Sequence, residues 1–204
     1  DAAVRDLHVR KKPREIIATA KAPGGVELRL VRHDNDHIIM IDSNELMSSR
    51  LGGSEEALAT LSCDRLRERT KPHLLIGGYG MGFTLRAALA RLGPQAKITV
   101  AELVPEIIDW ARGPMSALTA GCLDDPRVRL ITGDVPADIA ASAKSYDAIL
   151  LDVDNGPSGL TSAANDGLYS MKGLARAKTA LKPGGVLAIW SAAPDDAFTR
   201  RLDK

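Results

Sequence analysis

Acidic side chains follow three apolar segments between residues 97 and 151, and they are the residues best placed to do chemistry. They are Glu102, Asp134, Asp152 and Asp154. A carboxylate at the end of a buried strand can accept hydrogen bonds from ribose or adenine, or can hold a cationic amine. An acid in such a place costs free energy unless it has a partner. Asp152, which directly follows the apolar segment 148–151, is therefore the first candidate for a catalytic role.

A glycine-rich loop precedes these acids. Residues 77–82 read Gly-Gly-Tyr-Gly-Met-Gly and follow the apolar segment 73–76. Glycine lets the backbone approach a ligand closely, and the helix that follows offers free N–H groups. We therefore expect a ligand at this loop. The predicted ligand-binding residues of the loop and of the strand ends are Gly77, Gly78, Tyr79, Gly80, Gly82, Glu102, Leu103, Gly133, Asp134 and Asp152.

Each of these features also has a structural alternative. The glycines could form only a tight turn, because turns use the same residue. Glu102 could be a solvated surface residue, and Asp134 could cap a helix. Tyr79 and Trp190 are candidates for lining the pocket, and core packing is the alternative for Trp190.

Strands and helices alternate over most of the chain. We predict strands and helices in turn at residues 73–76, 84–91, 97–101, 105–112, 128–132, 137–143, 148–151, 168–181 and 186–190, with a further helix after Pro194. Apolar strands alternating with helices indicate an α/β fold, a Rossmann-like doubly wound, mostly parallel sheet. In such a sheet, ligands bind at the carboxyl ends of the strands. No segment after residue 190 has the pattern of the antiparallel strands that normally complete such a sheet.

The first 53 residues read differently. We interpret residues 1–24 as a polar arm and residues 26–32 and 37–42 as a β-hairpin, because apolar and polar residues alternate there. Residues 1–53 form one unit in this interpretation, and residues 54–204 form the nucleotide-binding domain. A helix should begin at Ser54 as N-cap, with leucines facing inward. Those leucines are Leu58, Leu61 and Leu66.

Composition excludes several classes of function. The chain has 204 residues with 27 basic and 26 acidic ones, and a net charge of +1 gives no general field for nucleic acid or a membrane. Two cysteines without metal-ligand spacing argue against a zinc site or a disulfide framework. No apolar run is long enough to span a bilayer. We expect a cytoplasmic protein that uses no metal.

The chemistry-bearing segments, in this order, resemble the spermidine synthase branch of the class I S-adenosylmethionine-dependent transferases. The matching segments are Ser54-Glu55-Glu56, Ile76-Gly77-Gly78, Val100 to Leu103, Gly133-Asp134, Tyr146 to Asp152, Gly156-Pro157 and Leu181 to Gly185. The resemblance implies a pocket for S-adenosylmethionine or its decarboxylated form. It also implies catalysis by Asp152 and Asp154, and contacts of Asp154 and Asn155 with a small acceptor, an amine.

The sequence departs from that family at three places. The family has an acid within its glycine loop that binds the cofactor amine, but the loop here has none. The family has two aspartates three residues apart, but Asn155 stands three residues beyond Asp152. Ala57 and Leu58 stand about where the family has a Tyr-His pair. Loss of the loop acid favours ordinary S-adenosylmethionine over the decarboxylated form.

Four hypotheses about function follow. The first is a spermidine synthase-like transferase that alkylates an amine. The second is a methyltransferase of unknown acceptor, and the third is a non-catalytic nucleotide-binding homologue. A nicotinamide dehydrogenase is the most distant, since it would use only the glycine loop and the first acid. The hairpin and residues 45–53 offer edge and apolar surface, so we expect a homodimer.

Overall fold

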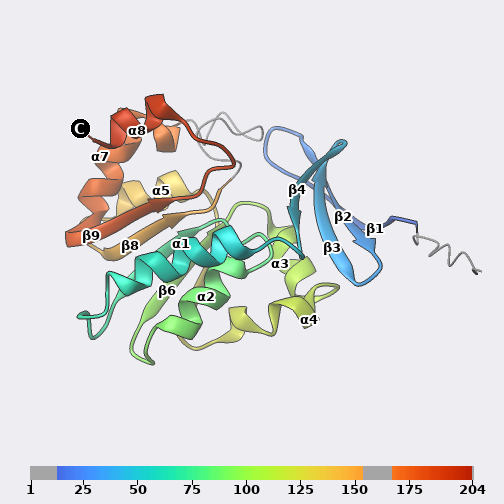
Figure 1. Ribbon diagram of the computed structural model, residues 1–204, viewed down its shortest axis with the longest axis horizontal. Coiled ribbons are helices and arrows are strands. Elements are labelled where there is room, and N and C mark those ends of the chain that lie inside the picture. Colours follow the sequence, from blue (N-terminus) through green and yellow to red (C-terminus); the bar gives the residue numbers. More distant parts are fainter. Residues whose placement is uncertain (1–12, 154–166, 204) are drawn as a thin grey trace, which may run out of the picture.

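The computed structural model describes residues 13–153 and 167–203. These residues form a small antiparallel sheet and a larger α/β unit beside it (Figure 1). The small sheet has the strand order β1-β2-β3-β4. Its strands are β1 (Glu15–Lys21), β2 (Glu27–His33), β3 (Asp36–Ile41) and β4 (Asn44–Ser48).

The predicted hairpin is confirmed as β2 and β3, in which Leu30 pairs with Ile39. The prediction of a polar arm is wrong for residues 15–21, which form strand β1. This segment, EIIATAK, has too irregular an alternation to indicate a strand by itself, and only Ala20 is fully buried. The edge of β2 supplies the hydrogen-bond partners that make it a strand. Residues 44–48, for which no strand was predicted, likewise form β4 by pairing with β3.

The larger unit contains a five-stranded parallel sheet with the order β7-β6-β5-β8-β9. Its elements and the flanking helices are α1 (Gly53–Asp64), β5 (His73–Gly77), α2 (Phe83–Arg91), β6 (Lys97–Glu102), α3 (Pro105–Arg112), α4 (Ser116–Thr119), the 3-10 turn η1 (Cys122–Asp124), β7 (Val128–Thr132), α5 (Val135–Ala141), β8 (Tyr146–Leu151), α7 (Met171–Ala180), β9 (Leu181–Ile189) and α8 (Asp196–Leu202). The predicted Rossmann-like fold is confirmed. The strand order reverses at β5, which places a ligand crevice at its carboxyl end.

Helices cover both faces of this sheet because successive strand residues point to opposite sides. In β5, Leu74 and Ile76 belong to one apolar core, and Leu75 belongs to another. The first core contains residues of α1, α2 and α3, whereas the second contains residues of α5, α7 and α8. Figure 1 shows the two layers of helices on either side of the strands. No helix within residues 13–153 and 167–203 is long and apolar enough to cross a bilayer.

Helix α1 corrects two predictions. Its N-cap is Gly52 and not Ser54, whose hydroxyl instead donates to Glu55 Oε2 at 2.6 Å. Leu66 is buried as predicted, but Leu61 is 68% exposed. The small residues Ala59, Ser62 and Cys63 are buried instead of Leu61, which lets α1 pack closely on α2.

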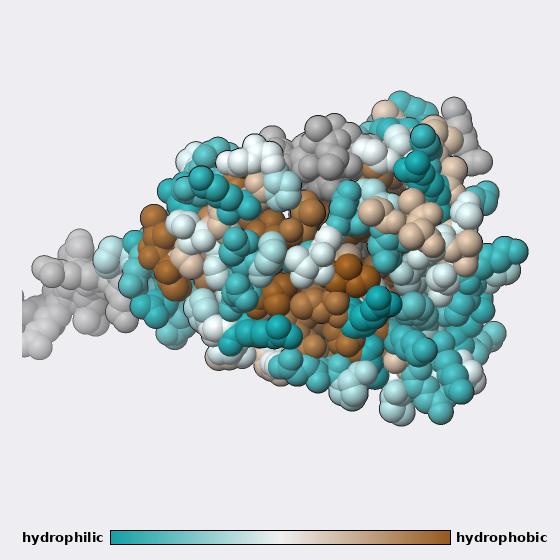
Figure 2. Space-filling model, turned by 180° about the vertical axis from the view of Figure 1, so that it is seen from behind, coloured by the Kyte–Doolittle hydropathy of each residue, from teal (hydrophilic) through white to brown (hydrophobic). Residues whose placement is uncertain are grey.

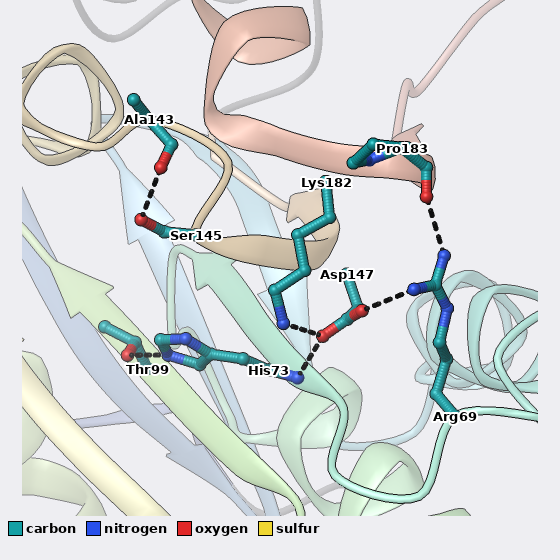
Figure 3. A network of polar contacts seen from close by, with 8 residues as sticks. All are labelled: Arg69, His73, Thr99, Ala143, Ser145, Asp147, Lys182 and Pro183. Carbon is teal, nitrogen blue, oxygen red and sulfur yellow. Dashed lines mark hydrogen bonds and ion pairs between the residues drawn. The ribbon is translucent and has the colours of Figure 1, made fainter.

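A buried ion-pair network closes the amino-terminal edge of the sheet, away from the ligand crevice (Figure 3). Asp147 is almost completely buried and accepts from the Lys182 ammonium at 2.7 Å and from the His73 backbone N–H at 2.8 Å. Arg69 lies 3.5 Å from the same carboxylate and donates to the carbonyl of Pro183. Burial alone would raise the pKa of Asp147, but these donors and cations hold it below its ordinary value. Strand β9 begins at residue 181 rather than at the predicted 186, because Leu181 pairs with Tyr146 of β8 before an irregularity in the register.

Candidate active site

A cavity of about 440 Å³ lies at the carboxyl ends of β5, β6 and β8, between the main sheet and the small sheet. The small sheet, the start of α1, the glycine loop and the ends of the main strands all contribute lining residues. Figure 2 shows hydrophobic residues gathered between the small sheet and the body of the molecule, with hydrophilic residues around them. The topology therefore places a largely apolar cavity where an α/β sheet binds its ligand.

The glycine loop borders this cavity through Gly78 and Gly80. Both have positive φ, 86° and 55°. A Cβ on Gly78 would overlap the backbone carbonyl of Asp152, and a Cβ on Gly80 would lie 2.6 Å from the Met47 methyl group. Glycine is thus required at both positions, because the backbone is left-handed and neighbouring atoms leave no room for a Cβ.

The other predicted residues of the loop do not line the cavity. A Cβ on Gly77 would meet Val135, and Gly82 is the N-cap of α2 with a φ of 75°. The side chain of Tyr79 is only 3% exposed and lies in the core, where its hydroxyl is 3.4 Å from Cys122 Sγ. Trp190 does line the cavity. Any contact of Tyr79 with a ligand would thus come from its backbone.

Glu102 ends β6 inside the cavity and is 5% exposed, so it is not a solvated surface residue. Its two carboxylate oxygens accept backbone N–H groups of Tyr79 and Val104, each at 2.9 Å. Burial raises the pKa of Glu102, and these donors oppose the rise. The backbone N–H groups of Gly80 and Leu103 also interact with this carboxylate and lower its pKa. Glu102 therefore fastens the glycine loop to the end of β6.

Asp134 lies at the N-cap of α5, but its side chain makes no capping hydrogen bond. It lines the cavity, and burial raises the pKa of its carboxyl group. The helix-capping alternative is thus not what this side chain does. Leu103 lines the cavity beside it, whereas Gly133 does not, and Gly133 donates its N–H to the Glu102 carbonyl at 2.9 Å.

Asp152 extends from the end of β8 into the same cavity. Its backbone N–H donates to the carbonyl of Gly77 at 2.8 Å, and its Oδ2 accepts from the Thr84 hydroxyl at 2.8 Å. Burial raises the pKa of Asp152 to about 7, the negative charges of Glu55 and Glu102 add to the rise, and the Thr84 hydroxyl opposes it. A carboxyl group with this pKa can accept a proton near neutral pH. Asp154 and Asn155 lie outside the described residues.

Two residues of this site were missed by the sequence reasoning. Thr84, in the first turn of α2, holds the Asp152 carboxylate. Glu55, in the first turn of α1, is buried in the wall of the cavity. Both were interpreted only as parts of helices, since neither stands at the end of a strand. The sequence signal that could have identified them was their position in the first turn of a helix. In this fold those first turns face the carboxyl ends of the strands.

The charge of the cavity is one-sided. Among the described residues that line it, five are carboxylic acids and none is Lys, Arg or His. The five acids are Glu45, Glu55, Glu102, Asp134 and Asp152. In an environment of low dielectric constant this arrangement attracts cations and repels anions. Within residues 13–153 and 167–203, no group of three or more His, Cys, Asp and Glu side chains is arranged to hold a metal ion.

Comparison with known proteins agrees with this architecture. Residues 54–195 match the spermine/spermidine synthase domain. The chain belongs to this family. Members of the family that are similar to the chain include polyamine aminopropyltransferase 2 of Pseudomonas aeruginosa, 32% identical over 169 residues, which are 77% of this chain and 44% of that protein. Putrescine N-methyltransferase 2 of Nicotiana tabacum is 39% identical over 128 residues, 59% of this chain and 33% of that protein.

The solved structures of spermidine synthases share the fold. That of Thermotoga maritima has a TM-score of 0.75 at 20% identity and covers 92% of this chain and 63% of its own. A spermidine synthase in complex with the transition-state analogue AdoDATO has a TM-score of 0.73 at 19% identity, covering 92% of this chain and 62% of its own. The chain thus spans less than half the length of the curated relatives described above and under two thirds of these structures.

Proposed function

We propose that this spermidine synthase-family protein transfers an aminopropyl group from decarboxylated S-adenosylmethionine to a small amine. The observation that carries the proposal is the cavity, whose described lining residues include five carboxylic acids and no Lys, Arg or His. The decarboxylated donor carries a sulfonium and an ammonium group, whereas the ordinary form adds a carboxylate that this field repels. The charge of the whole cavity thus favours the decarboxylated donor, even though the glycine loop has no acid of its own.

The described residues can divide the work of binding. Gly78 and Gly80 allow close approach of the donor to the backbone, Glu102 accepts from its ribose, and Asp134 accepts from its adenine amine. When bound, the donor supplies an electrophilic carbon next to a sulfonium sulfur. These contacts would hold that carbon in line with the acceptor, which is the larger part of catalysis for a good leaving group.

Asp152 would act on the acceptor. The nitrogen lone pair forms the new N–C bond, the C–S bond breaks with its electron pair going to sulfur, and the sulfonium becomes a neutral thioether. The proton lost by the nitrogen goes to the Asp152 carboxylate. Because burial and neighbouring charges raise the pKa of Asp152 to about 7, its affinity for this proton is greater than that of an ordinary carboxylate.

Methyl transfer to the same kind of amine is a second candidate. It is supported by the similarity to a protein named putrescine N-methyltransferase and by the glycine loop, which has no acid that would repel the carboxylate of ordinary S-adenosylmethionine. Acceptor binding and the role of Asp152 would be the same, and only the carbon attacked would change.

The test compares the two donors in one assay. The purified chain is titrated calorimetrically with each donor and is then incubated with each donor and 1,4-diaminobutane, and the product is identified by mass. Tighter binding of the decarboxylated form with an aminopropyl product supports the proposal. Tighter binding of the ordinary form with a methylated product moves the protein to the second candidate, and binding of neither donor refutes the pocket assignment.

We also propose that the protein is a cytoplasmic homodimer, with the small sheet at the interface. The exposed side chain of Ile16 on β1 and that of Leu51 after β4 offer apolar surface there. Light scattering coupled to gel filtration measures the mass in solution, and a monomer at micromolar concentration would contradict this proposal.

A further inference from the structure

Glu55 is a buried carboxylate in the cavity wall, and no cation among the described residues pairs with it. Its residue is 5% exposed, and the hydroxyl of Ser54 donates to its Oε2 at 2.6 Å. No ion pair among the residues that the structure describes includes Glu55. Buried charges in proteins are normally paired, because removal from water is costly. A cationic ligand that enters the cavity would supply such a partner for Glu55.

The structure brings Glu55 to the same cavity as Asp152. The hydroxyl of Thr84 donates to Asp152 Oδ2 at 2.8 Å and lies 3.3 Å from the backbone carbonyl of Glu55. This one side chain thus connects the first turn of α1, the first turn of α2 and the end of β8. The negative charge of Glu55 contributes to the raised pKa of Asp152, so the two carboxylates repel each other when no cation is present.

Stabilisation of the helix start does not explain the burial of Glu55. An acid in the first turn does interact favourably with the partial positive charge of α1. Glu56 is in the same turn and is exposed, where this benefit carries no desolvation cost. Binding of a cation does explain it, because two carboxylates in one cavity attract a positively charged ligand.

Asp152 and Glu55 belong to different walls of the cavity. Asp152 touches the glycine loop directly, because its N–H donates to Gly77 and its carbonyl closely abuts Gly78. Glu55 projects from α1, a different wall of the cavity. Asp152 is therefore suited to the nitrogen that reacts, and Glu55 to a second positive group on the same molecule.

We propose that Glu55 is a specificity-determining residue that binds the non-reacting ammonium group of a diamine acceptor while Asp152 receives the reacting nitrogen. This inference rests on the proposed function. It also assigns the second carboxylate of the acceptor site to α1, in a chain whose residue three beyond Asp152 is Asn155.

The experiment compares two acceptors of equal carbon length, 1,4-diaminobutane and n-butylamine, with wild type, Glu55→Gln and Glu56→Gln. Wild type should prefer the diamine. Glu55→Gln should raise KM for the diamine about tenfold or more, the loss expected for a charged hydrogen bond, with little change in kcat or in KM for butylamine. Glu56→Gln should behave as wild type, and Glu55→Asp, which keeps the charge, should retain part of the preference.

Calorimetry with the two amines, in the presence of 5′-methylthioadenosine, provides a readout that needs no turnover. Loss of diamine preference in Glu55→Gln alone supports the inference. An equal loss for both amines, or a fall in kcat alone, would overturn it, because Glu55 would then act on the reacting nitrogen or through Asp152. If wild type makes no product with either donor, the proposed function fails. The inference fails separately if wild type binds both amines equally or binds neither.

Discussion

The raised pKa of Asp152 leads to a prediction about both turnover and the free energy of unfolding. In Asp152→Asn the side chain keeps its shape and an oxygen that accepts from Thr84, but it cannot ionise. We expect this variant to lose most of its turnover, by a factor of about 10² to 10⁴, because the proton acceptor is gone. We also expect the unliganded variant to be more stable than wild type at high pH.

The sign of the stability effect follows from linkage. The folded state holds the Asp152 proton up to a pKa of about 7, whereas the unfolded chain releases it near 3.8. Between these values the folded state binds more protons, so wild type loses stability as pH rises. Each pKa unit corresponds to about 1.4 kcal/mol, so the loss between pH 4 and pH 8 is on the order of 4 kcal/mol.

Urea unfolding at several pH values measures this effect as a difference between wild type and Asp152→Asn. Titrating groups that do not interact with Asp152 are common to both proteins and cancel. The free energy of unfolding of the variant, relative to wild type, should rise by about 3 to 4 kcal/mol from pH 4 to pH 8. Asp124→Asn, whose side chain is 70% exposed, serves as the control and should show no comparable trend. Parallel stability curves for wild type and Asp152→Asn would refute the claim that burial raises this pKa.

Three further predictions concern the frame around the site. Replacing Asp147 by Asn should lower the free energy of unfolding by about 2 to 4 kcal/mol, since the buried carboxylate loses the charge that pairs with the partly exposed Arg69 and Lys182. Asp64→Asn, at a surface ion pair, should cost less than about 1 kcal/mol in the same urea titration. Gly78→Ala should abolish donor binding and destabilise the fold by more than about 1 kcal/mol, whereas Gly93→Ala, which has open space, should do neither. Glu102→Gln should weaken donor binding about tenfold or more in calorimetry, and unchanged affinity would remove Glu102 from the ribose site.

The order of elements in the larger unit could be predicted because its strands are short apolar runs separated by helices. Helix α3 and strand β7 begin and end where the pattern predicts, at Pro105–Arg112 and Val128–Thr132. Strands β1 and β4 could not be predicted, because an edge strand of mixed composition is defined by its partner rather than by its own residues. The exposure of Leu61 has a similar cause, since α1 packs through small residues that carry little hydrophobic signal.

The sequence by itself determined the glycine loop, the parallel sheet and the acids at the strand ends, because these depend on local pattern and on one rule of topology. Only the tertiary structure decided which side chains share the cavity. It turned the Tyr79 ring into the core and brought Glu55 from α1 to the cavity of Asp152. The physical reason is that burial and electrostatic coupling depend on distances between residues far apart in the chain. The pKa of Asp152 and the one-sided charge of the cavity are therefore properties of the fold.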